Sequence, residues 1–165
     1  MPFDIRPIAP ADIPAIAALA RATWEVAYHG IITPAQIDYM LAQRYSAAQL
    51  QADLADAHKW LYQAFMDGER VGYAACEVSE KGEFKLDKLY VHPDMQRRGV
   101  GAALVEHAAS IAREHGHAAM ILYVNKHNAQ AIRAYGKYGF TVREKVVTDI
   151  GGGFVMDDFL MEKPV

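Results

Sequence analysis

The 165-residue sequence contains a single cysteine, Cys76, so the chain cannot form an internal disulfide. Cys76 lies in the strand-like run Val71–Val78, where we expect it to pack in the core. The histidines show no metal-ligand spacing with carboxylates or cysteines beyond the pair His115 and His117 at the end of a predicted helix. We therefore expect no metal site.

The chain also lacks a long apolar run and a basic run. No stretch approaches the length of a membrane span, and residues Met1 to Arg6 do not contain the apolar segment of a secretory signal. We therefore expect a cytoplasmic protein with no membrane partner, and the absence of Lys/Arg-rich runs gives no indication of nucleic acid binding. An apolar content of 52% with 22% charged residues is enough for one core, so we expect a single domain over residues 1–165.

The net charge of -3 is unevenly distributed along the chain. Residues 1–84 contain 6 Lys/Arg and 11 Asp/Glu, whereas residues 85–145 contain 10 Lys/Arg and 5 Asp/Glu. A basic middle beside acidic flanks suits a protein that holds a polyanion centrally and takes a cationic substrate from the flanks, and it equally suits ordinary solvated charge.

Hydrophobic periodicity and turn residues predict an alternation of strands and helices. After an opening strand, three helices are expected, beginning at the N-caps Asp12, Thr33 and Ser46. Strands are then expected at Lys59–Met66, Val71–Val78, Leu86–Val91, Ala118–Val124 and Thr141–Thr148, and beyond the Gly151–Gly153 turn at Phe154–Met156 and Phe159–Met161. The strands from Lys59 to Val91 predict an antiparallel meander, and helices are expected after Gly99 and after Asn128.

A glycine-containing turn joins the strand that ends at Val91 to the next helix. Its sequence is Gln96-Arg97-Arg98-Gly99-Val100-Gly101. Unpaired N–H groups and the positive end of the dipole at a helix N-terminus favour an anion such as a phosphate, and glycine lets it approach the backbone. The turn lacks the Gly-Lys-Ser/Thr of a P-loop, and Leu104 stands where a dinucleotide fingerprint needs a third glycine. The glycines alone are equally consistent with close packing of the helix on its strand.

A second strand-to-helix connection with polar residues follows the strand Ala118–Val124. Asn128 begins a helix and Tyr135 follows seven residues later, which places both on one helix face about 10 Å apart along the axis. One ligand lying along that face could meet both side chains. Taken singly, Asn128 also suits a helix cap and Tyr135 a core aromatic.

The sequences of these two strand-to-helix connections together resemble motifs of the GNAT superfamily of acetyl-CoA-dependent N-acetyltransferases. The similarity covers Leu86–Phe140, through Gln-x-x-Gly-x-Gly and then Asn-x-x-Ala-x-x-x-Tyr-x-x-x-Gly-Phe, and the ending Asp149–Lys163 resembles the final hairpin of bacterial polyamine and diamine acetyltransferases. The resemblance implies an α/β (α+β) GNAT fold, in which about four to five helices flank a mixed central sheet of about seven strands. It also implies a bulge near the end of the central strand and a splayed, V-shaped cleft beside it.

The resemblance further implies acetyl-CoA as cosubstrate, with no metal. The residues that it assigns to cofactor binding are Leu89, Tyr90, Val91, Gln96, Arg97, Arg98, Gly99, Val100, Gly101, Ala102, Asn128 and Tyr135. Tyr135 matches the tyrosine that donates a proton or hydrogen bond to the coenzyme A sulfur. Because Cys76 is the only thiol, direct attack in a ternary complex is preferred to a covalent acyl-enzyme.

The acceptor is expected to be the primary amine of a small molecule, with polyamines and diamines as candidates. Trp24, Glu25, Tyr28 and Asp87 are the candidate acceptor residues, and Glu25, Glu77 and Asp87 are the candidate bases. Two alternatives are a protein N-terminus or lysine as acceptor, and a non-catalytic acyl-CoA-binding module. A homodimer is also considered.

Overall fold

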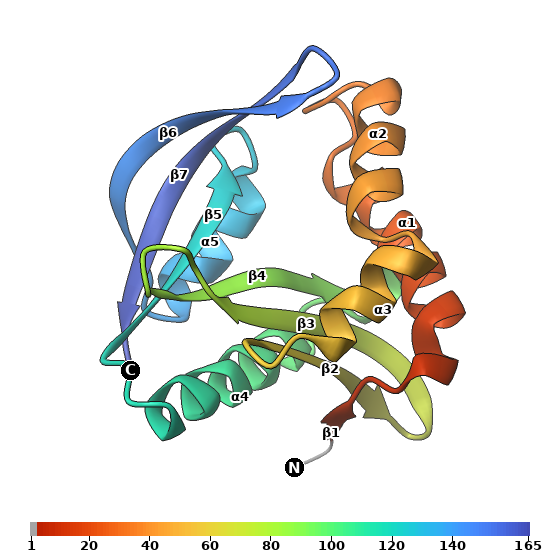
Figure 1. Ribbon diagram of the computed structural model, residues 1–165, viewed down its shortest axis with the longest axis vertical. Helices are drawn as coiled ribbons and strands as arrows, with labels where there is room; N and C mark the ends of the chain where they lie inside the picture. Colours follow the sequence, from red (N-terminus) through yellow and green to blue (C-terminus); the bar gives the residue numbers. More distant parts are fainter. Residues whose placement is uncertain (1–2) are drawn as a thin grey trace.

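A seven-stranded mixed sheet in the order β1-β2-β3-β4-β5-β7-β6 organises the fold (Figure 1). The computed structural model describes residues 3–165; Met1 and Pro2 lie outside the described residues. The strands are β1 (Phe3–Pro7), β2 (Lys59–Met66), β3 (Glu69–Val78), β4 (Phe84–Val91), β5 (Ala119–Asn125), β6 (Thr141–Gly151) and β7 (Phe154–Pro164). The helices are α1 (Ile13–Ala27), α2 (Pro34–Arg44), α3 (Ala47–Ala55), α4 (Val100–Glu114) and α5 (Ala129–Lys137), with short 3-10 turns at Pro10–Asp12 and Pro93–Met95. The GNAT-like architecture expected from the sequence is therefore confirmed, and β7 is one continuous strand rather than two short ones.

Two of the three predicted N-caps hold their helices as expected. The hydroxyl of Thr33 accepts a hydrogen bond from the backbone N of Gln36 at 3.1 Å, and Ser46 does the same for Gln49 at 3.2 Å. Asp12 is the exception, because its carboxylate instead accepts from the backbone N of Ala9 at 2.8 Å and from Arg70 at 3.0 Å. The prediction that the Asp12 side chain caps α1 is therefore wrong, since the carboxylate ties the start of α1 to the β2–β3 hairpin.

The sheet is antiparallel except where β4 and β5 run parallel. Within the described chain these two strands pair only at Phe84 with Met120 and at Lys85 with Ile121, and beyond that point they diverge. The divergence is the expected splay. In the β3–β4 ladder, Ala75 lies opposite Lys88 and Cys76 opposite Leu86, so Asp87 is an extra residue. The expected bulge is therefore present, but it lies in the middle of β4 rather than near its end.

The two faces of the sheet carry separate apolar cores, because side chains alternate along each strand. On one face α4 packs through Leu104 and Ala108 against Tyr62 and Phe84. On the other face α1, α2 and α3 pack through Trp24, Leu41 and Leu50 against Leu61 and Tyr73. Cys76 is 1% exposed in the first core, as predicted. Within residues 3–165, no helix is long and apolar enough to cross a membrane.

Candidate functional site

The gap between β4 and β5 opens into a groove of about 830 Å³. We call it the groove. Its walls are α1, the ends of β4 and β5, the first turn of α4 and one face of α5. Predicted site residues that line it are Tyr28, Asp87, Leu89, Tyr90, Val91, Gln96, Arg97, Gly99, Val100, Gly101, Ala102, Asn128 and Tyr135. Arg98, which was predicted with them, lies outside this lining.

The turn before α4 has the backbone geometry of an anion site. Arg97 and Gly99 adopt positive φ values of 65° and 87°, and Gly99 is the N-cap of α4. Glycine has no side chain to occupy the first N–H groups of the helix, which therefore face the groove together with the positive end of the dipole. Successive N–H groups in such a turn form a concavity suited to phosphate oxygens.

Further cations in the groove come from α5. Arg133 and Lys137 line it from positions one turn apart and join Arg97, whereas Asp87 is the one carboxylate of the described lining. Sequence reasoning missed both, although their i, i+4 spacing places them on one face of α5. The groove is therefore a predominantly cationic surface beside a helix N-terminus.

Asn128 and Tyr135, seven residues apart, also line the groove from α5. The Oδ1 atom of Asn128 accepts a hydrogen bond from the backbone N of Ala131 at 3.2 Å, so Asn128 caps the helix and lines the groove at once. The Tyr135 ring packs against Phe140 with ring centroids 5.9 Å apart. Burial raises the pKa of Tyr135, with a smaller contribution from Tyr28, so its phenol stays protonated across the physiological range.

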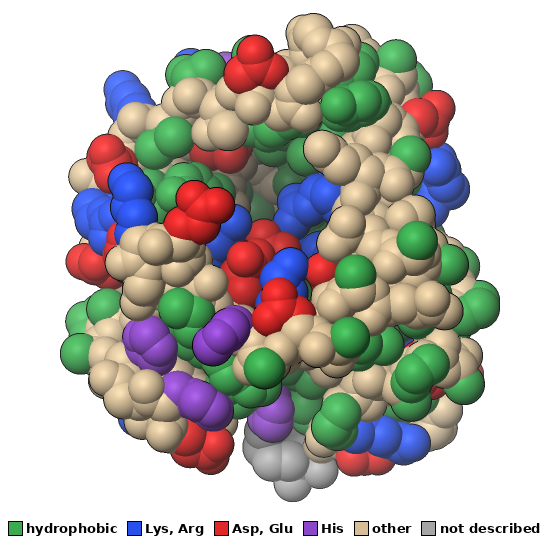
Figure 2. Space-filling view, viewed as in Figure 1, with side chains coloured by type: hydrophobic (Ala, Val, Ile, Leu, Met, Phe, Trp, Pro, Cys, Tyr) green, Lys and Arg blue, Asp and Glu red, His purple; other side chains and the backbone are tan. Residues whose placement is uncertain are grey.

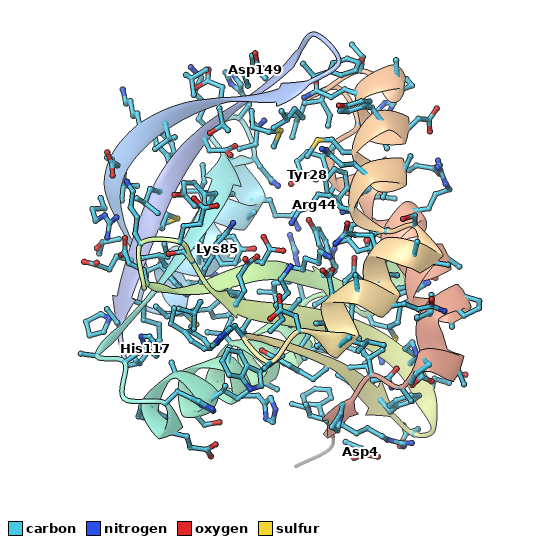
Figure 3. All side chains as sticks on the ribbon, viewed as in Figure 1. Asp4, Tyr28, Arg44, Lys85, His117 and Asp149 are labelled. Atoms are coloured by element: carbon cyan, nitrogen blue, oxygen red, sulfur yellow. The ribbon has the colours of Figure 1, made fainter. Side chains whose placement is uncertain are left out.

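A second cavity of about 560 Å³ opens on the other side of β4, and we call it the pocket. Figure 2 shows acidic and basic side chains gathered around the hollow at the centre of this face. In Figure 3, the labelled Tyr28, Arg44 and Lys85 surround the same opening from the C-terminal end of α1, from α2 and from β4. The groove and the pocket share four lining residues, which are Tyr28, Asp87, Tyr90 and Tyr123. A molecule in the groove and another in the pocket would therefore meet at this junction.

Asp87 sits at the junction in a cationic setting. Its Oδ1 lies 3.0 Å from Nη2 of Arg44 and 3.2 Å from Nζ of Lys85. Burial would raise the pKa of Asp87, but Arg44, Lys85 and Lys88 together lower it well below its usual range. A carboxylate held this firmly in its charged form is a weak proton acceptor, so the geometry disfavours Asp87 as the base.

Asp158 on β7 is a carboxylate that sequence reasoning missed. It lines the pocket, is only 7% exposed, and its Oδ1 accepts no hydrogen bond from residues 3–165. Burial and the neighbouring Asp157 raise the pKa of Asp158 to about 6, against the opposing effect of Arg44 and Lys85. No sequence motif marks Asp158, because what distinguishes it is burial without a partner.

The other predicted acceptor residues are distributed differently. Trp24 and Tyr28 line the pocket, and their rings pack against each other at a tilt of 42° with centroids 4.7 Å apart. Glu25 lines neither cavity, because it lies on the exposed face of α1 and pairs with Arg21 at 3.3 Å. The structure thus corrects the placement of Glu25 at the acceptor site. Glu77 does line the pocket, opposite Lys59 on β2 and Lys85 on β4.

The β6–β7 hairpin closes one side of the pocket by reaching α2 (Figure 1). Tyr39 donates from Oη to the carbonyl of Ile150 at 3.3 Å, and Gln36 donates from Nε2 to the carbonyl of Val155 at 3.0 Å. The ring of Tyr39 also packs against that of Phe154, with ring centroids 5.2 Å apart. The glycine turn at the hairpin tip is therefore held against α2, and the pocket is bounded on this side.

No group of three or more histidine, cysteine, aspartate or glutamate side chains within residues 3–165 is arranged to hold a metal ion.

Comparison with known proteins gives consistent matches. The sequence profile of the acetyltransferase (GNAT) family matches residues 17–140. A spermidine N(1)-acetyltransferase from Thermoplasma acidophilum is 27% identical over 162 residues, which is 95% of this chain and 97% of that protein.

Solved structures show the same fold. PaiA N-acetyltransferase from Thermoplasma acidophilum, in complex with coenzyme A, superposes with a TM-score of 0.85 at 25% identity and 100% coverage of both chains. A ribosomal-protein-alanine N-acetyltransferase from Brucella melitensis superposes with a TM-score of 0.72 at 23% identity, over 98% of this chain and 99% of that one. These names include a small amine and a protein as acceptors, so the fold alone leaves the acceptor open.

Proposed function

Because the chain belongs to the acetyltransferase (GNAT) family and is an acetyl-CoA-dependent acyltransferase, we propose that it acetylates the primary amine of a small molecule that binds in the pocket. Acetyl-CoA supplies the acetyl group as a thioester. The observation that carries the proposal is the meeting of two cavities of different character, a cationic groove and a bounded pocket, at Tyr28, Asp87, Tyr90 and Tyr123.

The groove fits coenzyme A on three counts. Arg97, Arg133 and Lys137 supply positive charge, and the first turn of α4 supplies N–H groups for phosphate oxygens. Beyond Lys85, no described strand pairs with the β5-facing edge of β4, so the backbone near Tyr90 and Val91 can bond an extended arm as an added strand would. PaiA N-acetyltransferase, which has the same fold, was solved in complex with coenzyme A, and this supports coenzyme A as the ligand.

The bounded pocket supports a small acceptor rather than a polypeptide. A protein N-terminus or lysine would have to enter with its flanking chain, and the contacts of Tyr39 and Gln36 with the β6–β7 hairpin close the side between that hairpin and α2. A cavity of about 560 Å³ is within the range of small-molecule sites.

Asp158 is the base that we propose for the amine. A lysine-like ammonium has a pKa of ~10.4 and must lose its proton before it can attack. Asp158 is ionised above pH 6, and its Oδ1 has no competing donor among residues 3–165. Glu25 is excluded by its position outside the pocket, and Asp87 is engaged by Arg44 and Lys85.

Tyr135 is proposed to act on the leaving sulfur as a hydrogen-bond donor. Because burial raises its pKa above the ordinary value for a phenol, full proton transfer to a thiolate is disfavoured, while donation of a hydrogen bond is not. Tyr135→Phe deletes only the hydroxyl, and single-turnover transfer at wild-type speed in this variant would contradict the role.

Direct transfer from thioester to amine follows from the state of the one thiol. Burial raises the pKa of Cys76 to about 12, and its side chain lies within the core under α4, away from both cavities. Cys76 is therefore unsuited to carry the acetyl group as an acyl-enzyme.

The proposed function is tested by measuring free thiol released from acetyl-CoA with a panel of small amines, peptides with free N-termini and lysine-containing peptides. Turnover with a small amine at a kcat/KM at least about tenfold above that of every peptide supports the small acceptor. Preference for a peptide would replace it with a protein acceptor. Binding of acetyl-CoA without turnover on any amine would indicate a binding module.

A further inference from the structure

The pocket is lined by as many cationic side chains as carboxylates. What this implies for the acceptor rests on the proposed function of amine acetylation. The four cations are Arg44, Lys59, Lys85 and Lys88, and the four carboxylates are Asp53, Glu77, Asp87 and Asp158. A site that selected a polyamine by charge alone would present carboxylates without competing cations, because like charges at short range repel. The lining therefore indicates an acceptor with charges of both signs.

The cations are concentrated at the end of the pocket formed by α2, α3 and the β2–β4 strands. Arg44 and Lys85 share Asp87, and Lys59 and Lys88 share Asp53 at 3.0 Å and 3.5 Å. Each of these carboxylates thus faces two cations. Glu77 lies opposite Lys59 and Lys85, and burial and the nearby Asp87 raise its pKa. Even with Glu77 counted as ionised, this end of the pocket has four cationic side chains and three carboxylates.

The geometry leaves hydrogen-bond donors at this end for a ligand. Arg44 uses Nη2 for both its contacts with Asp87, and its Nε and Nη1 donate to no group among residues 3–165. The side chains of Arg44 and Lys85 are 27% and 25% exposed, so neither is sealed in the core. A guanidinium with unused N–H groups beside an ammonium is well suited to bind a carboxylate.

The wall opposite carries the complementary charge. Asp158 projects from β7, where it is paired in register with Asn125 on β5 and is more than nine-tenths buried. Its Oδ1 has no donor among residues 3–165, although a buried carboxylate oxygen ordinarily has one. An ammonium from a ligand would satisfy it. The pocket therefore has a negative site on β7 and a positive site on α2 and β4.

We propose that the acceptor is a zwitterion of the amino-acid class, a small molecule that carries a carboxylate as well as the amine that is acetylated. Asp158 receives the amine, and Arg44 and Lys85 bind the carboxylate. A diamine of the same length presents a second ammonium to Arg44 and Lys85 and is disfavoured there. The name of the spermidine relative therefore does not transfer to this chain.

Matched pairs of acceptors that differ only by a carboxylate test the proposal. Thiol release from acetyl-CoA is measured with lysine against 1,5-diaminopentane, with ornithine against 1,4-diaminobutane, and with lysinamide as the neutralised form of the carboxylate. We expect kcat/KM for the amino acid of at least one pair to exceed that of its diamine by about tenfold or more, and lysinamide to resemble the diamine.

Substitutions of Lys85 and Arg44 test whether these residues cause the preference for the amino acid over the diamine. Lys85→Gln is expected to lower kcat/KM for the preferred amino acid by about tenfold and to leave the diamine unchanged or improved, and Arg44→Gln is a second variant with the same expectation. Lys81→Gln, on the exposed β3–β4 turn, is the matched control and is expected to change neither. Circular dichroism and the KM for acetyl-CoA verify that each variant is folded.

The outcomes separate this proposal from the one on which it rests. A preference for diamines over amino acids in wild type, or a loss in Lys85→Gln and Arg44→Gln that is equal for both members of a pair, would overturn the zwitterionic acceptor and leave amine acetylation standing. Absence of turnover with every small amine, while acetyl-CoA still binds, would overturn both.

Discussion

Asp158 on β7 and Asn125 on β5 lie opposite each other in the sheet, and both side chains line the pocket. The amide of Asn125 is used locally, because its Oδ1 accepts a hydrogen bond from the backbone N of His127 at 2.9 Å. Asp158 has no comparable partner among residues 3–165, although both side chains are less than 10% exposed. Because its Oδ1 has no hydrogen-bond donor among residues 3–165, Asp158 rather than Asn125 is the residue that can bind the amine of the acceptor.

The first prediction concerns the pH dependence of catalysis. Burial raises the pKa of Asp158 to about 6, so a base at this position is active above that pH and lost below it. We expect kcat/KM for the amine in wild type to fall as pH drops through about 6, and Asp158→Asn to lower kcat by about 100-fold and to remove this limb. Steady-state kinetics from pH 5 to 9 at saturating acetyl-CoA measure both. An unchanged acidic limb in Asp158→Asn would assign it to another group.

The second prediction is that the same substitution stabilises the fold. The pKa of Asp158 is higher in the folded protein than the ~3.9 of an unfolded chain, so ionisation destabilises the folded state. This penalty is absent below about pH 4, develops between pH 4 and 6, and is complete above, where it amounts to about 3 kcal/mol. Asp158→Asn is therefore expected to raise Tm by about 6–12 °C at pH 8 and by nothing at pH 4. A Tm gain of equal size at both pH values would contradict the ionisation argument.

The third prediction concerns Gly101 in the first turn of α4. A Cβ at this position would lie 2.6 Å from Oη of Tyr138 but 3.5 Å from its Cζ, so the obstacle is the hydroxyl of a residue that lines the groove. Gly101→Ala is expected to displace Tyr138 and to weaken coenzyme A binding by about tenfold, and Tyr138→Phe added to it is expected to restore affinity. Calorimetric titration of the single and double variants measures this. Equal weakening in both would show that the added methyl group obstructs the coenzyme directly.

The fourth prediction compares two neighbouring glycines in the β6–β7 turn. Gly152 and Gly153 both have positive φ, but a Cβ at Gly152 would lie 2.9 Å from a ring carbon of Tyr39, whereas one at Gly153 would have no atom within 4 Å among residues 3–165. Alanine is therefore strained at both positions by the positive φ, and only Gly152→Ala also pushes the hairpin away from α2. We expect Gly152→Ala to raise KM for the amine about fivefold without changing KM for acetyl-CoA, and Gly153→Ala to change neither. Equal effects of the two variants on KM for the amine would show that the contact with Tyr39 does not shape the pocket.

The groove could be predicted from the sequence because its residues are close together in the chain. Gln96–Ala102 and Asn128–Tyr135 are short motifs at strand–helix joints, where backbone N–H groups and one helix face decide the chemistry. Arg133 and Lys137 share one face of α5 through their i, i+4 spacing, but that face lies roughly 140–180° round the helix from Asn128, so the spacing that joins Asn128 to Tyr135 does not include them. Arg98 was assigned to the cofactor because it lies within the turn Gln96–Gly101 that the resemblance covers, but in the structure it does not line the groove.

The pocket could not be predicted in the same way. Arg44 ends α2, Lys59 begins β2 and Asp158 belongs to β7, so only the folded sheet brings them to one cavity. Glu25 was favoured because it lies between Trp24 and Tyr28 in sequence, yet a helix turns about 100° per residue, so Glu25 is rotated away from the buried Trp24 and is exposed beside Arg21. The bulge at Asp87 likewise depends on the register of β3, which no local pattern in β4 records.

Direct transfer between a groove-bound thioester and a pocket-bound amine is tested by following a labelled acetyl group in a single turnover. The protein is loaded with acetyl-labelled coenzyme A, mixed with an amine that supports turnover, and quenched at intervals, and intact-mass spectrometry of the protein is compared with the yield of acetylated amine. We expect the label to pass to the amine with no acetylated protein at any time. Acetylated protein that forms before the amine product and decays as it appears would contradict direct transfer.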